Sequence, residues 1–184
     1  YHTKEDMIEC VNAFYEGMVQ RSEEMKRHPD YKTGENYAYL GLPPCFLIFD
    51  EYVAFLEMLG TKESMSLLSQ LKKIVMLGRQ AGYFLIVACQ RPDAKYFSDG
   101  IRDNFNFRVG LGRISELGYG MLFGSDVKKQ FFQKRIKGRG YCDVGTSVIS
   151  EFYTPLVPKG HDFLQTIGSL ALARQAVSDE RKEN

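Results

Sequence analysis

The stretch that most constrains this chain runs from residue 45 to residue 51, where an apolar run leads directly into Asp50 and Glu51. A run this short, preceded by Pro43 and Pro44, predicts a strand that is buried on both faces of a sheet. Ionised carboxylates at the end of a core strand are costly unless a positive group meets them. The two acids therefore need either a partner or a structural reason to stand there.

Two explanations fit the acidic pair. In nucleoside triphosphatases, the first acid after such a strand holds Mg²⁺ and the second polarises the attacking water, the arrangement known as Walker B. Alternatively, the strand is followed by a helix whose N-terminal dipole favours Asp and Glu. The stretch alone does not separate the two explanations.

The composition is that of an ordinary globular domain. Of the 184 residues, 44% are hydrophobic and 26% are charged, and the net charge is +1. The near-neutral charge excludes a global basic field, so any DNA contact has to be local. No apolar run approaches the length of a membrane span, and the polar beginning lacks the apolar region of a signal peptide. The four cysteines form no CxxC pair, which favours reduced thiols over disulfides or a zinc site.

The distribution of apolar and turn residues predicts alternating helices and strands. Helices are expected over residues 5–27, 52–59, 63–77, 98–104 and 115–123, and from about residue 161 onward. Strands are expected over residues 45–51, 83–89, 106–112, 138–144 and 147–153, with a loop over 28–44.

The first two strands and the helix between them form a βαβ unit. Such crossovers are right-handed and place the strands parallel in one sheet. Ligands bind at the carboxyl ends of parallel strands, and Asp50, Glu51 and Gln90 occupy those ends. The sequence therefore predicts that these three side chains lie side by side.

A phosphate-binding loop of the form GxxxxGK[ST] is absent from the sequence. A chain with a Walker B strand is expected to have such a loop upstream. The simplest expectation is that these residues are a fragment whose phosphate loop lies on a preceding segment. The fragment alone is then expected to be inactive.

Three segments carry a family resemblance. They are the strand that ends in Asp50-Glu51, the turn Gly78-Arg79-Gln80-Ala81-Gly82, and the strand that ends in Cys89-Gln90-Arg91-Pro92. In this order they resemble the motor domain of the FtsK/SpoIIIE family of DNA translocases, in which Thr stands where this chain has Cys89. The spacing from Asp50 to Arg79 is a few residues longer than is usual in the family. The resemblance extends over about residues 7–160.

The resemblance implies a fold and a domain division. The implied fold class is α/β, a RecA-like P-loop NTPase core with a mainly parallel sheet flanked by helices, incomplete at its N-terminal side. The chain would be a single partial motor domain, with its core at about 5–160 and a C-terminal helix and tail at 161–184.

The resemblance also implies roles for individual residues, with ATP and Mg²⁺ as cofactors. Asp50 would hold the Mg²⁺ through water, and Glu51 would orient or deprotonate the attacking water. Gln90 would sense the γ-phosphate, since an amide both donates and accepts hydrogen bonds. Arg79 would reach the nucleotide of a neighbouring subunit; its alternative role is a cation that balances the dipole at a helix C-terminus.

The implied cargo is double-stranded DNA, moved by a hexameric ring on the cytoplasmic face of the bacterial membrane, where another segment would anchor it. The run over residues 143–153 resembles FtsK-like proteins of Gram-positive conjugative transposons, which implies conjugative transfer. A basic segment is a candidate for phosphate contacts, although it also fits a solvated helix face; its candidate residues are Lys128, Lys129, Lys134 and Arg135. The alternatives are a type VII-like protein-secretion ATPase and a non-hydrolysing binding module.

Overall fold

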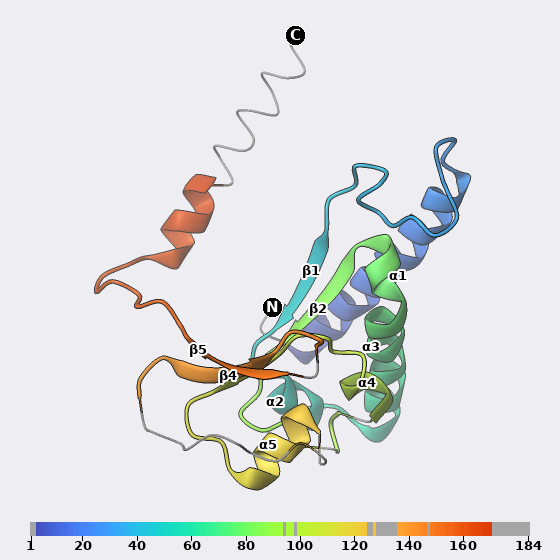
Figure 1. The fold of residues 1–184 in the computed structure, drawn as a ribbon. Helices are drawn as coiled ribbons and strands as arrows, with labels where there is room; N and C mark the ends of the chain where they lie inside the picture. Colours follow the sequence, from blue (N-terminus) through green and yellow to red (C-terminus); the bar gives the residue numbers. More distant parts are fainter. Residues whose placement is uncertain are drawn as a thin grey trace.

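The computed structural model describes residues 3–93, 95–97, 99–124, 127, 136–146 and 148–170. Within them the chain forms two sheets that are flanked by helices (Figure 1). Strands β1 (Cys45–Phe49) and β2 (Tyr83–Val87) pair in parallel, with Cys45 opposite Tyr83 and Phe49 opposite Val87. The predicted βαβ unit is thus confirmed.

Helices α1 (Lys4–Arg27) and α3 (Thr61–Ala81) pack side by side against the β1–β2 sheet (Figure 1). Helix α1 buries Val11, Met18 and Met25, which recur every seven residues and so share one helix face. Helix α3 runs into β2 through Gly82, whose φ of 77° lets the chain leave the helix in a left-handed turn. The layer formed by α1 and α3 therefore sets the direction of β1 and β2.

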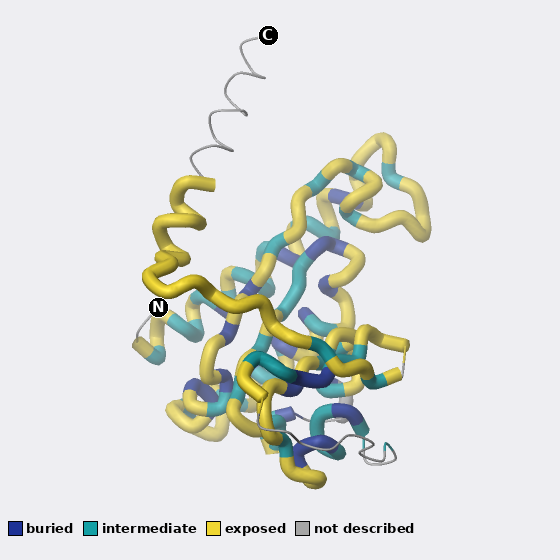
Figure 2. The backbone as a smooth tube through the Cα atoms, turned by 60° about the vertical axis from the view of Figure 1, so that its left-hand side comes forward, coloured by how far each residue is buried: buried dark blue, intermediate teal, exposed yellow. Residues whose placement is uncertain are grey.

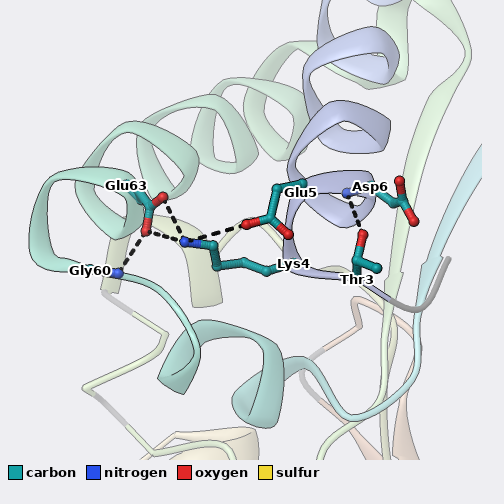
Figure 3. A network of polar contacts seen from close by, with 6 residues as sticks. All are labelled: Thr3, Lys4, Glu5, Asp6, Gly60 and Glu63. Carbon is teal, nitrogen blue, oxygen red and sulfur yellow. Dashed lines mark hydrogen bonds and ion pairs between the residues drawn. The ribbon is translucent and has the colours of Figure 1, made fainter.

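The N-termini of α1 and α3 are joined by a small polar network (Figure 3). The Lys4 ammonium donates to both carboxylate oxygens of Glu63, at 3.0 and 3.3 Å. The Gly60 N–H donates to the same carboxylate at 2.8 Å, and Thr3 caps α1 by accepting from the N–H of Asp6 at 3.1 Å. The Gly60 N–H and the Lys4 ammonium hold the pKa of Glu63 below its usual value.

The expectation that β1 is buried on both faces is wrong for the described residues. Leu47 and Phe49 are buried, whereas Phe46 and Ile48 are 55% and 68% exposed, and Ile86 of β2 is 47% exposed. Side chains alternate between the faces of a strand, and α1 and α3 cover only one face. The apolar run therefore reflects a second sheet face that α1 and α3 leave largely open, with the Tyr37 ring meeting it at Phe84, 6.0 Å between centroids.

The second sheet is antiparallel, in the order β3 (Arg108–Leu111), β4 (Arg139–Asp143) and β5 (Ile149–Tyr153). The predicted strands are confirmed, but the expectation of a mainly parallel sheet is corrected here, because three of the five described strands pair antiparallel. For β4 and β5 the physical reason is the short link between them, which permits a hairpin and is too short for a parallel crossover. A small separate core of Tyr119, Phe123 and Tyr141 lies beneath this sheet.

The remaining predicted helices are also present. They are α2 (Tyr52–Glu57), α4 (Asp99–Arg102), α5 (Glu116–Phe123) and a helical segment over 163–170. Residues 153–170 are exposed throughout and extend away from the two sheets (Figure 2). None of the helices in the described ranges is long and apolar enough to span a membrane.

Candidate active site

The acidic pair sits on a turn that is fastened to the neighbouring strand. The Ala88 N–H donates to the carbonyl of Phe49 at 2.8 Å, and the Ala88 carbonyl accepts from the N–H of Tyr52 at 3.1 Å. The backbone on either side of Asp50 and Glu51 is thus hydrogen-bonded to one residue at the end of β2. This arrangement holds both carboxylates at the carboxyl edge of the parallel sheet.

Tyr52 anchors the turn from below. Its side chain is 1% exposed, and its ring lies edge-on to Phe49, with centroids 5.8 Å apart. The hydroxyl donates to the carbonyl of Tyr96 at 3.4 Å, and burial raises the pKa of Tyr52. Because the ring cannot move without opening the core, helix α2 begins at a fixed place directly after the acidic pair.

Glu51 has an unusual backbone conformation. Its φ is 55° and its ψ is 48°, in the left-handed region, and it is the one non-glycine residue in the described ranges with a positive φ. The side-chain amide of Gln90 donates to the Glu51 carboxylate at 3.5 Å, which is a long hydrogen bond. The structure therefore brings Glu51 and Gln90 together, and both side chains are exposed.

The carboxylate of Asp50 is exposed and makes no hydrogen bond or ion pair with the described part of the chain. Its hard oxygens suit Mg²⁺, which prefers one or two carboxylates together with water and phosphate oxygens. No cluster of three or more His, Cys, Asp or Glu residues occurs among the residues with described positions. The donor set fits a metal that a nucleotide helps to hold.

Cys89, between Ala88 and Gln90, takes the position that is Thr in the family pattern. Burial raises the pKa of the Cys89 thiol, with a smaller contribution from the Glu51 carboxylate nearby. The backbone N–H of Arg91 acts in the opposite direction on this pKa. Cys89 thus behaves as a neutral, half-buried side chain behind the acidic pair.

Arg79 lies away from the other predicted site residues. It is exposed in the last turn of α3, which leads to the beginning of β2 and so to the opposite edge of the sheet. A five-residue strand separates the two edges by about 15 Å. Arg79 is therefore too far away to act on a nucleotide beside Glu51 of the same copy.

A cleft of about 480 Å³ separates the two sheets next to Gln90. Strand β2 is paired only to β1 and strand β3 only to β4 within the described residues, so each has an unpaired edge. Residues of both strands line the cleft: Val87 at the end of β2, and Arg108, Val109, Gly110 and Leu111 of β3. The Arg108 guanidinium donates to the carbonyls of Phe105 and Leu122, at 2.9 and 3.2 Å, and so braces β3 against α5.

Ala88 and the basic candidates for nucleic-acid contact remain to be compared with the sequence-based expectations. Ala88 was missed, because its contribution is made by backbone groups and its side chain gives no signal. The nucleic-acid candidates lie outside the described residues and stay a prediction; these are Lys128, Lys129, Lys134 and Arg135.

Among known proteins, a curated relative matches most of the chain. The FtsK domain-containing protein YdcQ of Bacillus subtilis (strain 168) is 56% identical over 167 residues, which cover 91% of this chain. Over this stretch the chain is similar to an FtsK domain-containing protein, in agreement with the resemblance of its sequence to the FtsK/SpoIIIE family. It spans 35% of the length of YdcQ. No protein-family profile matches the chain.

Solved structures of ATPases share the fold. The conjugation coupling protein TcpA of pCW3, in a monomer form with ATPγS, aligns with a TM-score of 0.62 at 17% identity, over 82% of this chain and 44% of TcpA. The cytoplasmic domain of the type VII secretion ATPase EccC of Thermomonospora curvata aligns with a TM-score of 0.60 at 20% identity, over 86% of this chain and 19% of EccC. EssC of Geobacillus thermodenitrificans gives 0.57 at 15% identity, over 98% of this chain and 32% of EssC. The fold is thus that of a partial FtsK-like ATPase core.

Proposed function

We propose that this chain carries the metal- and water-binding half of an ATP-hydrolysing motor that moves double-stranded DNA. The observation that carries the proposal is the contact between Glu51 and Gln90 at the carboxyl edge of the β1–β2 sheet, beside the Asp50 carboxylate, which has no partner among the described residues. Asp50 would hold Mg²⁺ through water, and Mg²⁺ supplies charge neutralisation of the phosphates when it is bound. Glu51 accepts a proton from the attacking water or orients it. Gln90 senses the γ-phosphate by hydrogen bonding from its place at the end of β2.

The phosphate-binding loop would come from another part of the full protein. The cleft supports this, because the end of β2 and the whole of β3 line it and each of the two strands has an unpaired edge within the described residues. A loop at the end of such a strand would emerge beside Gln90. The greater length of the relative YdcQ leaves ample sequence for this segment.

The DNA cargo is supported by the conjugation coupling protein among the structural neighbours and by the FtsK domain of the relative. In this proposal a ring of copies, with six as the expected number, sits at the cytoplasmic face of the membrane and moves DNA for conjugation. Contacts along the DNA would be mostly to phosphates and therefore independent of sequence.

A second candidate function is protein secretion. It is favoured by the likeness to EccC and EssC, of which the first is a type VII secretion ATPase. The fold and the acidic pair serve both functions equally, so the cargo has to be decided by experiment. A non-hydrolysing binding module is the third alternative, and the exposed, unpaired Asp50 with the Glu51–Gln90 contact argues against it.

The deciding experiment measures ATP hydrolysis by the full-length protein with and without double-stranded DNA. We expect stimulation by DNA that weakens as salt is raised, because phosphate contacts release counterions. Glu51→Gln should abolish hydrolysis and leave ATP binding intact, whereas Glu16→Gln, on the exposed side of α1, should change neither. Stimulation by a secreted polypeptide but not by DNA would overturn the DNA motor, and turnover by the isolated 184-residue chain would overturn the half-site.

A further inference from the structure

The two segments that leave the carboxyl edge of the parallel sheet are joined to each other by side chains. One segment is α2, which follows the acidic pair, and the other is the loop that follows Gln90. Within this loop, Tyr96 is bonded to both ends of α2. Its carbonyl accepts from the hydroxyl of Tyr52, the first residue of α2, at 3.4 Å. Its own hydroxyl donates to the carboxylate of Glu57, the last residue of α2.

Lys95 also belongs to this contact. Its ammonium donates to the Glu57 carboxylate at 2.9 Å and to the Tyr96 hydroxyl at 3.2 Å, and it lies over the Tyr96 ring, 4.9 Å from the centroid. Glu57, Lys95 and Tyr96 thus form one hydrogen-bonded group, the Glu57 cluster. The two charged side chains are 52% and 70% exposed, so their ion pair contributes little to the free energy of unfolding.

Short turns connect the cluster to Gln90. The Asp93 N–H donates to the carbonyl of Arg91 at 3.0 Å. The Asp93 carbonyl accepts from the N–H groups of Tyr96 and Phe97, at 2.9 and 3.1 Å. Because these hydrogen bonds restrict the backbone between Tyr96 and Gln90, a displacement of Tyr96 also displaces the end of β2.

The contact between Glu51 and Gln90 needs support of this kind. Both side chains are exposed, and their separation of 3.5 Å is at the long limit of a hydrogen bond. A small displacement of a reacting or sensing group can lower a rate strongly. Glu57 lies in the stretch between Asp50 and Arg79 that is longer here than is usual in the family, so a role for it does not follow from the resemblance.

We propose that the three residues of the Glu57 cluster are positioning residues for Gln90. They hold the loop after Gln90 against α2 and so keep the Gln90 amide beside the Glu51 carboxylate. None of the three touches the nucleotide, and their loss is felt only through Gln90. The inference rests on the proposed function, in which Glu51 and Gln90 act on the attacking water and the γ-phosphate.

The first test measures ATP hydrolysis by variants of the full-length protein. Glu57→Ala should lower kcat by about 10-fold with an unchanged KM for ATP, because positioning is lost while ATP binding is kept. Glu57→Gln keeps an acceptor for the Tyr96 hydroxyl and should retain most of the activity. Lys62→Ala, which removes an exposed charge from the first turn of α3, is the control and should leave kcat and KM unchanged. The melting temperature should change little in all three variants.

The second test determines whether the cluster acts through Gln90. Gln90→Ala should lower kcat by about 10²-fold, the usual effect of removing one donor from a developing charge. If Glu57 only positions Gln90, adding Glu57→Ala to Gln90→Ala should cause no further loss, so the two effects should be non-additive. An independent structural defect would instead multiply the two losses.

The outcomes separate the two proposals. Unchanged hydrolysis in Glu51→Gln and Gln90→Ala would overturn the proposed function and, with it, this inference. If both of those variants lose activity, an unchanged kcat or a raised KM in Glu57→Ala would overturn the positioning role alone. Losses that multiply in the double variant, or a much lower melting temperature of Glu57→Ala, would do the same and leave the proposed function standing.

Discussion

At the scale of single residues, Glu51 carries backbone strain where the chemistry is expected. Its left-handed conformation costs an L-residue on the order of 1 kcal/mol relative to glycine. The turn tolerates this cost because Ala88 fixes the backbone on both sides, and the conformation aims the carboxylate at Gln90. Strained backbone of this kind is found at functional sites, where a particular side chain is required at the strained position.

Replacing Glu51 with Gly should therefore stabilise the chain. Glu51→Gly removes the cost of the positive φ, and we expect a gain of roughly 0.5–1 kcal/mol in the free energy of unfolding. Glu51→Gln keeps the Cβ and the strain, so it is the matched control and should be neutral. Urea unfolding of both variants checks this; equal stabilities for the two would show that the turn is unstrained.

Cys89 gives a prediction for alkaline pH. Burial raises its pKa above the ordinary value of 9.0, so the folded chain keeps the thiol proton at a pH where the unfolded chain has lost it. Its contribution to stability is fully present below the ordinary value and is lost as the pH rises through it toward the folded pKa. Melting temperatures measured from about pH 8 to about pH 10.5 should fall less in Cys89→Ala than in the parent. The tyrosines titrate in both proteins and cancel, so identical slopes would contradict the burial effect.

At the scale of elements, the site depends on how closely α3 approaches β2. Gly78 is buried at the contact, and a Cβ there would lie 2.2 Å from the carbonyl oxygen of Tyr83. Arg21 of α1 supports the same junction by donating to the carbonyls of Pro43 and Ala81, at 2.7 and 3.4 Å. The direction of β2, and with it the position of Gln90, is set by this contact.

Gly78→Ala should destabilise the chain by about 1–3 kcal/mol, because the added methyl group meets rigid backbone. Gly168→Ala is the matched control, since nothing lies within 4 Å of a Cβ at that helical position. Thermal unfolding of the two variants gives the comparison. A Gly78→Ala protein as stable as the parent would mean that α3 can shift away from β2 at no cost.

At the scale of the whole molecule, the open sheet face and the unpaired edges of β2 and β3 dominate. Exposed apolar side chains on a face next to unpaired strands promote association between copies. The described residues thus form two layers with an exposed apolar face and unpaired strand edges. Such a face and such edges are what the proposed half-site is expected to show, because its phosphate loop would come from another part of the full protein.

Ile48→Lys should reduce self-association of the isolated 184-residue chain with little change in stability. Ile48 is 68% exposed, so replacing it loses little burial, and a surface substitution of this kind costs about 0.5 kcal/mol or less. Leu47→Lys, on the buried face of the same strand, is the contrast and should unfold the chain. Sedimentation at several concentrations measures the association; equal association by Ile48→Lys and the parent would place the contact elsewhere.

The sequence by itself determined the βαβ unit, the order of the strands along the chain and the placing of Asp50, Glu51 and Gln90 at one edge of the parallel sheet. Apolar periodicity can be read from the order of the side chains, and the right-handed crossover follows from a general rule for parallel strands. Only the tertiary structure decided that Ala88 clasps the acidic turn, that Glu51 is left-handed, that one sheet face is open and that the Gln80 amide donates to the carbonyl of Glu35 in the loop over residues 28–44. The Ala88 hydrogen bonds are made by backbone groups, which every residue possesses, and the other features depend on which distant segments meet in the fold, so none of them leaves a pattern in the sequence.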